Sequence, residues 1–170
     1  MKKGRIDFID NLLSDSNVAE LIDITKNFTP YRTPDEPGNF YYNTYVDTAN
    51  FTDFLNSIQS YYYSKSNKYL MEIGGMWINK VGNTSNKSDI FHNDESRLST
   101  VTLLNDDYEG GYFNYFNEKE EEVSIKCKKF TTLIFDGKAT GHRVLPVTQG
   151  TRWSFVTFWA TKQKTTKTLL

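Results

Sequence analysis

The chain contains two histidines, and each lies in a segment whose residue types could bind a metal ion. Asp94 follows His92 by two positions, so in an extended backbone both side chains project to the same side and can chelate one ion. His142 must then arrive from a distant segment. Two imidazoles and one carboxylate can hold Fe(II) on one face of an octahedron and leave the remaining positions open. The residues therefore predict a metal site formed by His92, Asp94 and His142.

Ten residues beyond the second histidine, Arg152 and Ser154 offer groups that bind a carboxylate. A guanidinium pairs with a carboxylate through two parallel N–H bonds, and a serine hydroxyl on the same face can donate a third. We expect a hairpin that pairs Val147 with Thr151. On that register Arg152 lies roughly 13 Å along the ladder from His142. A five-carbon 2-oxo diacid that chelates the metal through its 2-oxo acid end could span much of this distance.

Each of these signals is weak alone and has an ordinary structural explanation. A His-x-Asp triplet can arise by chance, a lone His142 is more often a hydrogen-bonded core residue, and a lone Arg152 is usually a surface or ion-pair residue. Their combination in this order, with Arg-Trp-Ser at 152–154, favours a functional site over chance.

The length and charge are those of an ordinary globular domain. In 170 residues we expect one domain over 1–170, with a helical support region at 1–68, a β core at 69–161 and a polar tail at 162–170. The net charge of -1 gives no overall field that would attract nucleic acid or an anionic membrane. No apolar stretch is long enough to cross a bilayer, so neither nucleic acid nor membrane is expected as a partner.

Cys127 is the single cysteine, which excludes an intramolecular disulfide and fits a reducing cytoplasm. A structural role is favoured over a catalytic one for this thiol. The abundance of Asn, Lys, Tyr and Phe is compatible with an AT-rich, virus-encoded gene. We therefore expect a cytoplasmic protein, and a viral one would act in the cytoplasm of its host.

Two amphipathic helices are expected in the first 68 residues. Ser14 can cap the first, and Val18, Leu21 and Ile22 follow at roughly helical spacing. The second spans 51–62 and has one apolar face, formed by Phe51, Phe54, Leu55, Ile58 and Tyr62. Short strands at 5–9 and 40–46 and a proline-containing loop at 29–38 complete this region.

From residue 69 onward, short segments rich in β-branched and aromatic residues alternate with turn signals. We place strands near residues 70–80, 97–104, 111–116, 121–126, 129–135, 141–147 and 151–161. In the last strand, one face carries Arg152, Ser154, Val156 and Phe158, and the other carries Trp153, Phe155, Thr157 and Trp159. The expected fold is mainly β, a jelly roll (double-stranded β-helix), with supporting N-terminal helices outside and a polar ligand inside.

These residues and their flanks resemble the prolyl 4-hydroxylase-like family of 2-oxoglutarate/Fe(II)-dependent dioxygenases. The matching segments are Phe91-His-Asn-Asp94, Val101-Thr-Leu-Leu-Asn-Asp-Asp-Tyr-Glu-Gly-Gly111, Gly141-His-Arg-Val-Leu-Pro-Val147 and Gly150-Thr-Arg-Trp-Ser154. The family's usual pattern is His-x-Asp, a strand ending in Leu-Asn, a Gly-Gly turn, and His-x-Val-x-Pro-Val before Gly-x-Lys/Arg. The resemblance covers about residues 70–160.

The resemblance implies that His92, Asp94 and His142 bind Fe(II). It implies that Arg152, aided by Ser154, anchors the distal carboxylate of the cosubstrate 2-oxoglutarate. The implied activity is that of a dioxygenase, an oxidoreductase that uses O2 to hydroxylate a C–H bond, with ascorbate as a candidate reductant. The first substrate expected is a prolyl residue in a peptide or protein.

Two positions depart from the family pattern. Tyr112 follows the Gly-Gly turn where an acidic residue is common, and Leu103 stands where some members have a cosubstrate-contacting tyrosine. Trp77 and Asn79 face one way on the strand before His92 and could line the cosubstrate pocket. The alternative, a core tryptophan and a solvated asparagine, explains them equally well.

Other functions remain open on the sequence. The substrate could instead be a free amino acid, a nucleobase or another small metabolite. A non-catalytic jelly-roll module that binds a sugar or a protein leaves the metal-ligand residues unexplained, and a metal-binding cupin usually supplies three histidines. The run Tyr61-Tyr-Tyr63 could wall a proline-rich peptide, although packing is the favoured explanation.

Overall fold

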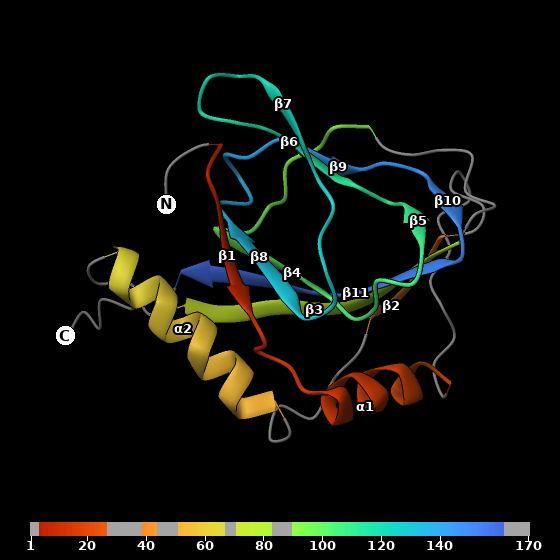
Figure 1. Cartoon of the computed structure of the whole chain (residues 1–170). Helices are drawn as coiled ribbons and strands as arrows, with labels where there is room; N and C mark the ends of the chain where they lie inside the picture. The colour runs from red at the N-terminus through yellow and green to blue at the C-terminus, as the bar shows by residue number, and fades with distance from the viewer. Residues whose placement is uncertain (1–3, 27–38, 44–50, 67–70, 83–89, 162–170) are drawn as a thin grey trace.

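The computed structural model describes residues 4–26, 39–43, 51–66, 71–82 and 90–161. Its described strands form a six-stranded antiparallel sheet and two smaller sheets that lie over one face of it (Figure 1). The large sheet has the order β1 (Ile6–Asp10), β8 (Thr131–Phe135), β4 (Leu98–Leu103), β11 (Thr151–Thr161), β3 (Met71–Gly82) and β2 (Asn39–Asn43). The smaller sheets are β7 (Glu122–Ile125), β6 (Phe113–Phe116) and β9 (His142–Val144), and β10 (Val147–Gln149) with β5 (Glu109–Gly110). This architecture is the jelly roll expected from the sequence.

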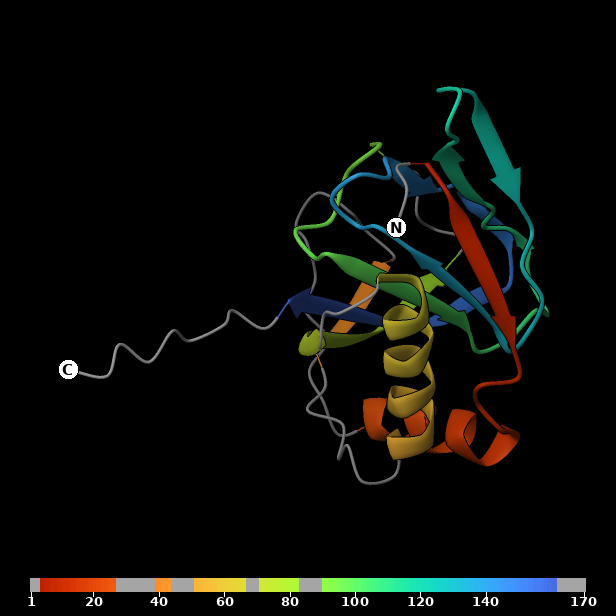
Figure 2. The same ribbon diagram turned by 90° about the vertical axis from the view of Figure 1, so that its left-hand side faces the viewer.

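The helices α1 (Asp15–Thr25) and α2 (Thr52–Ser66) lie on the opposite side of the large sheet (Figures 1 and 2). Ser14 caps α1 as predicted, because its hydroxyl accepts from the Asn17 N–H while the Asn17 side chain accepts from the Ser14 N–H. α2 buries Phe54, Ile58 and Tyr62 on the predicted apolar face. Neither of these two described helices is long and apolar enough to span a membrane.

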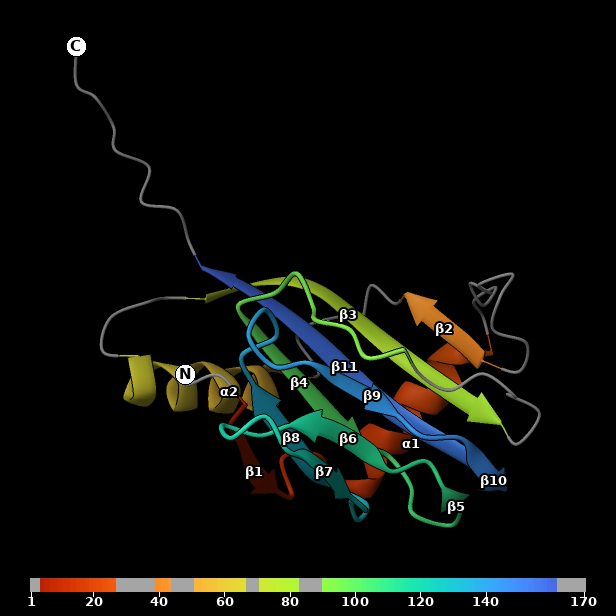
Figure 3. The same cartoon turned by 90° about the horizontal axis from the view of Figure 1, so that it is seen from above.

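β11 runs through the large sheet between β3 and β4 (Figure 3). Its two faces contribute to different hydrophobic cores. Phe155 belongs to the outer core under the helices, and its ring lies 5.6 Å from that of Phe54. Ser154 lies opposite Leu103, a member of the inner core between the sheets. Arg152 lies two residues from Ser154, on the same face. This alternation of faces is the predicted one.

The predicted hairpin between the strands of His142 and Arg152 is wrong. β9 pairs with β6 and β10 pairs with β5, whereas β11 pairs with β3 and β4. Pro146 has no N–H to donate to a ladder, and its carbonyl oxygen accepts from the Gly111 N–H at 2.8 Å. Gly150, with a φ of +78°, then returns the chain to the large sheet. The two side chains therefore come from different sheets, and the separation derived from the hairpin register does not hold.

The remaining boundaries differ from prediction in small ways. The strand expected at 111–116 begins at Phe113, because Gly111 has a φ of +62° and does not continue a regular strand. The segment 141–147 contains β9 and the start of β10, with a break at the proline. The expected loop at 29–38, the end of the strand at 40–46 and the tail from residue 162 lie outside the described residues.

Candidate metal centre

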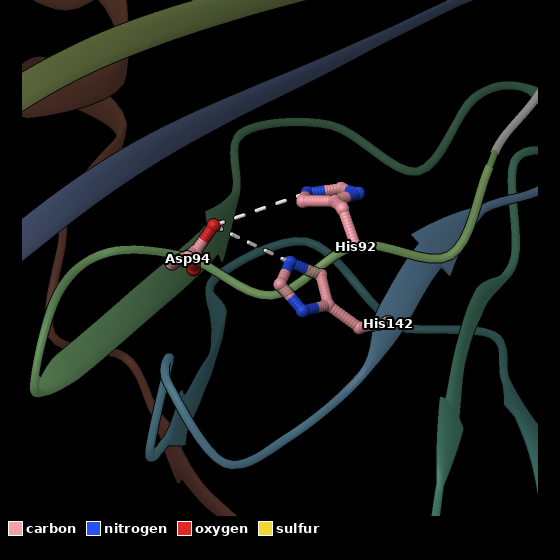
Figure 4. A group of neighbouring side chains, drawn as sticks. All are labelled: His92, Asp94 and His142. Atoms are coloured by element: carbon pink, nitrogen blue, oxygen red, sulfur yellow. Dashed lines mark ion pairs between the residues drawn. The ribbon is translucent and has the colours of Figure 1, made fainter.

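His92, Asp94 and His142 lie together and point toward one another (Figure 4). One potential ligand atom from each lies within 4.8 Å of the other two, and each imidazole Nε2 is 3.8 Å from Asp94 Oδ1. The structure thus brings together the three side chains that the sequence singled out. Two nitrogen donors and one oxygen donor in this arrangement could hold one transition-metal ion.

The backbone itself brings the two histidines together. His92 and His142 form an isolated antiparallel bridge, in which the N–H of each donates to the carbonyl of the other at 3.0 and 2.9 Å. His92 Nδ1 lies 3.2 Å from the Ile90 carbonyl oxygen, and His142 Nδ1 lies 3.0 Å from that of Thr140. A ring nitrogen that faces a carbonyl oxygen carries the hydrogen, which leaves each Nε2 with a free lone pair. Both rings are held in the tautomer that a metal ligand needs.

Asp94 is oriented by hydrogen bonds to its backbone and to one carboxylate oxygen. Its N–H donates to the Gly137 carbonyl at 3.0 Å, and the Ser99 hydroxyl donates to Oδ2. The Ser96 hydroxyl lies 2.6 Å from that of Ser99 and completes the group. Oδ1 is therefore the oxygen that faces the histidines. Gly137 leaves the space for this arrangement, because a Cβ there would collide with Ser99 Oγ and lie 2.7 Å from the Ser96 carbonyl oxygen.

The centre is packed on one side and open on the other. The His142 side chain is 7% exposed, and its ring lies 5.3 Å from that of Phe113 and 4.8 Å from that of Phe135. Burial lowers the pKa of His142, while the nearby Asp94 acts in the opposite direction. The His92 side chain is 59% exposed. A second reactant can therefore approach from the side of His92.

Arg152 is a buried cation without a carboxylate partner among the described residues. It is 2% exposed, its Nη1 donates to the Ser154 hydroxyl at 3.0 Å, and its Nε has no hydrogen-bond partner. Arg97 and Arg143, in contrast, each form an ion pair with a carboxylate. Because a buried guanidinium is costly unless an anion binds it, Arg152 is a candidate group for binding an anion inside the jelly roll.

A family model described as the 2OG-Fe(II) oxygenase superfamily matches residues 76–160, which is half of the chain. The chain belongs to this superfamily. The match confirms the resemblance inferred from the sequence, and the metal and cosubstrate of this oxygenase class are Fe(II) and 2-oxoglutarate. No curated protein matches the chain at a significant level.

Solved structures share the fold of this oxygenase at low sequence identity. A prolyl-4-hydroxylase from Pseudomonas putida is 16% identical, with 95% of this chain and 94% of that chain covered and a TM-score of 0.69. A prolyl hydroxylase from Trichoplax adhaerens, in complex with a hypoxia inducible factor peptide fragment, is 14% identical, with coverages of 92% and 84% and a TM-score of 0.71. HygX from Streptomyces hygroscopicus, with nickel, 2-oxoglutarate and hygromycin B bound, is 10% identical, with coverages of 93% and 83% and a TM-score of 0.65.

The residues of this oxygenase fit both groups that its superfamily implies. The His-Asp-His donor set, with both Nε2 lone pairs free, suits Fe(II), which accepts imidazole and carboxylate ligands. The buried Arg152, with an unpartnered Nε, suits one carboxylate of a diacid. Both His142 and Arg152 contact the inner core, the first through Phe113 and the second beside Tyr108 and Gly111. The three potential metal ligands and the buried Arg152 therefore border one interior.

Asn79 and Trp77 have different surroundings in the oxygenase. Asn79 lies directly across from Ser154 in the pairing of β3 with β11, and its Oδ1 is buried without a hydrogen-bond partner, although the residue as a whole is partly exposed. Trp77 packs against the inner core, and its ring lies 6.4 Å from that of Phe158. Asn79 thus retains a free polar atom near Ser154, and Trp77 contributes to packing.

Sequence reasoning missed Tyr108, which lies beside Arg152 of the oxygenase. It is 4% exposed, and a Cβ built on Gly111 would lie 3.0 Å from both Tyr108 Cε2 and Arg152 Cδ. Burial raises the pKa of Tyr108, partly offset by Arg152, so the phenol is protonated at neutral pH. One feature of the sequence could have drawn attention to Tyr108. It is an aromatic residue in an otherwise polar loop, directly before Glu109 and the Gly-Gly turn.

The tyrosine run on α2 lies on the other side of the large sheet. The Tyr61 hydroxyl donates to Asp7 of β1, Tyr62 belongs to the outer core, and Tyr63 is exposed. These contacts support the packing explanation for Tyr61 and Tyr62.

Proposed function

We propose that the protein is a hydroxylase in which His92, Asp94 and His142 hold Fe(II) and Arg152 and Ser154 bind the distal carboxylate of 2-oxoglutarate. One observation carries this proposal: three side chains that could hold a metal ion border the same interior as a buried arginine without a carboxylate partner among the described residues. The reaction converts 2-oxoglutarate, O2 and a substrate C–H bond into succinate, CO2 and a C–OH group.

When bound, Fe(II) and 2-oxoglutarate supply the oxygen activation and the C–H oxidation. The residues of the chain orient and enclose these groups. The Ile90 and Thr140 carbonyls fix the His92 and His142 rings, and the Ser99 hydroxyl keeps Asp94 turned toward them. These contacts preorganise three ligands and leave the other metal positions to reactants.

The chain's other contribution is an electrostatic anchor in a dry interior. Arg152 neutralises the distal carboxylate, and Ser154 can donate its hydroxyl hydrogen to it. Asn79 is the third cosubstrate-binding residue that we propose, because its Oδ1 is buried without a hydrogen-bond partner directly across from Ser154. The amide can present either its oxygen or its nitrogen after a rotation, so it can also donate to an anion. Phe113 and Phe135 exclude water around His142.

For the substrate, we propose a prolyl residue in a peptide or protein. The likeness in fold to the Pseudomonas putida prolyl-4-hydroxylase and to the Trichoplax adhaerens prolyl hydroxylase supports this class. The likeness to HygX, which was solved with hygromycin B, supports the alternative of a small molecule. Release of succinate on addition of proline-rich peptides, and not of free amino acids, nucleobases or other metabolites, is the expected result. The reverse pattern would replace the prolyl substrate with a small one.

The first experiment is an anaerobic titration of the protein with Fe(II), followed by 2-oxoglutarate. A metal-to-ligand charge-transfer band in the visible is expected, because 2-oxoglutarate chelates the metal. The band should vanish in Asp94→Ala and persist in the matched control Asp23→Ala, which alters an exposed ion pair with Lys26 on α1. If the folded, metal-loaded protein gives no band, a non-catalytic jelly-roll binding module becomes the better explanation.

A further inference from the structure

The turn between β8 and β9, residues 136–141, contacts two of the three potential metal ligands directly. Its Gly137 carbonyl accepts from the Asp94 N–H at 3.0 Å, and its Thr140 carbonyl oxygen lies 3.0 Å from His142 Nδ1. The first contact fixes the backbone from which the carboxylate projects, and the second fixes the orientation of an imidazole ring. The position of this turn therefore decides where both ligand atoms lie.

The same turn also holds the segment of the third ligand, His92. The side-chain amide of Asn93, the next residue, donates to the Lys138 carbonyl at 3.1 Å. His92 itself exchanges two backbone hydrogen bonds with His142, which follows directly after the turn. All three ligands are thus connected to this one turn.

Asp136 is the first residue of the turn and closes it from within. Its backbone carbonyl accepts from the N–H groups of Ala139 and Thr140 at 3.2 and 3.0 Å, and its carboxylate Oδ1 accepts from the Ala139 N–H at 3.2 Å. The residue is 1% exposed. A carboxylate at this depth is costly unless a cation pairs with it, so the turn needs such a partner.

Arg97 supplies the cation. Its Nη1 lies 3.2 Å from Asp136 Oδ2, and its N–H donates to the Trp159 carbonyl of β11 at 3.0 Å. It lies three residues after Asp94, on the segment that enters β4. The ion pair therefore joins the turn to the segment that carries the metal-binding carboxylate. Because the Arg97 side chain is 47% exposed, its replacement should leave the protein folded.

From this geometry we infer that Asp136, held by Arg97, is a positioning residue for the metal centre: it fixes the turn whose carbonyls orient Asp94 and His142. The inference rests on the proposed function, in which these side chains hold Fe(II). Both carboxylate oxygens of Asp136 have partners of their own, one in the turn and one on Arg97, so this residue is not a fourth ligand. It acts on the metal affinity through the backbone of the turn.

The test separates positioning from the effect of charge alone. Fe(II) is titrated anaerobically into the metal-free full chain in competition with a chromophoric chelator, and circular dichroism confirms that each variant is folded. For Asp136→Asn, we expect the Kd of Fe(II) to rise about tenfold, because an amide has one oxygen and cannot accept from both Ala139 and Arg97. Arg97→Met should raise the Kd by a similar factor, since the carboxylate loses its cation.

Charge alone predicts shifts of opposite sign, because loss of a nearby carboxylate weakens cation binding and loss of a nearby guanidinium strengthens it. Opposite shifts in the two variants would therefore overturn the inference. The double variant should also lose about tenfold, because both changes break the same interaction, and a loss of about a hundredfold would contradict action through the ion pair. If Asp136→Asn does not fold, the sign of the shift in Arg97→Met decides alone.

An unchanged Kd with a lower urea midpoint would show that the ion pair is merely structural. The matched control is Asp23→Asn, which alters an exposed ion pair on α1 and should leave the Kd of Fe(II) unchanged. If the unaltered protein does not bind Fe(II), the proposed function fails, and this inference fails with it.

Discussion

The side-chain amide of Asn105 holds the main chain on both sides of Arg152. Asn105 Nδ2 donates to the Thr151 carbonyl at 2.7 Å, and its Oδ1 accepts from the Trp153 N–H at 2.7 Å. Asn105 is the asparagine of the family pattern in which a strand ends in Leu-Asn, and it lies two residues after the end of β4. The motif thus fixes the start of β11, where the buried cation lies.

Asn105→Ala should destabilise the protein by about 2 kcal/mol, because it leaves the Trp153 N–H and the Thr151 carbonyl without these partners. The affinity for 2-oxoglutarate should fall as well, since the backbone that carries Arg152 is loosened. Urea unfolding of the variant measures the first effect as a lower midpoint at an unchanged m-value. An unchanged midpoint would show that the two hydrogen bonds of the Asn105 side chain contribute nothing to stability.

Arg152→Met should weaken 2-oxoglutarate binding by about 2–4 kcal/mol, because the charge that anchors the distal carboxylate is lost. Without ligand, this variant should be as stable as the parent protein or more so, because an apolar side chain replaces a buried, unpaired charge. Thermal melts with and without 2-oxoglutarate separate the two effects. Arg143→Met, which removes a partly exposed arginine paired with Glu122, is the control and should leave the affinity unchanged. If the Arg152→Met protein still binds 2-oxoglutarate normally, Arg152 is not the anchor of the distal carboxylate.

Ser99→Ala should reduce the affinity for Fe(II) by roughly 10–100-fold, the usual effect of removing a partner that orients a metal ligand. The reason is that Asp94 Oδ2 loses the hydroxyl that keeps Oδ1 turned toward the histidines. Anaerobic metal titration measures the change. Ser124→Ala serves as control, because that hydroxyl donates to Asn114 away from the metal centre. Equal affinities in both variants would contradict the orienting role of Ser99.

Gly137→Ala and Gly74→Ala should have opposite effects. A methyl group at Gly137 collides with Ser99 Oγ and the Ser96 carbonyl, so a loss of stability of about 1–3 kcal/mol and weaker Fe(II) binding are expected. A methyl group at Gly74 meets nothing closer than the Phe158 carbonyl oxygen at 3.7 Å. Alanine there should be neutral or stabilise by about 0.4–1 kcal/mol, since it restricts the unfolded chain. Chemical unfolding of both variants provides the comparison, and equal midpoints would refute the steric argument.

Cys127 should be unreactive toward alkylating reagents in the folded protein. Burial raises its pKa from an ordinary 9.0 to about 11, with Arg152 acting in the opposite direction. At pH 8 roughly one molecule in a thousand then carries the nucleophilic thiolate. The folded thiol keeps its proton between about pH 9 and 11, where the unfolded one loses it, so this group lowers folded-state stability as the pH rises through that window. Alkylation rates in buffer and in urea test this, and similar rates would contradict it.

The parts of the fold that sequence could predict are those with strong local periodicity. β11 alternates Arg152 and Ser154 with Phe155 and Trp159, and a period of two assigns them to opposite faces whatever their partners. The helix start at Ser14 was equally accessible, because a cap depends on residues a few positions apart.

The pairing of the strands could not be predicted from local sequence in the same way. The short connection between β10 and β11 reads as a hairpin turn whether the chain reverses within one sheet or passes to another. The distinction depends on Pro146, whose carbonyl accepts from the distant Gly111 N–H, and on the positive φ of Gly150. Tyr108 was missed for a related reason, since the proximity of a loop tyrosine to the distant Arg152 is visible only in the folded chain.

The residues that stabilise the helices and the residues of the candidate site lie on opposite faces of the large sheet. Buried residues of α1 and α2, such as Leu21 and Ile58, pack in the outer core, while His142 and Arg152 border the inner one. Because distant sites without shared partners contribute additively to stability, the helical layer can be redesigned for thermal tolerance with little effect on ligand geometry. For the same reason, we expect natural sequences to tolerate more substitutions in the helical layer than in the interior that contains the candidate site.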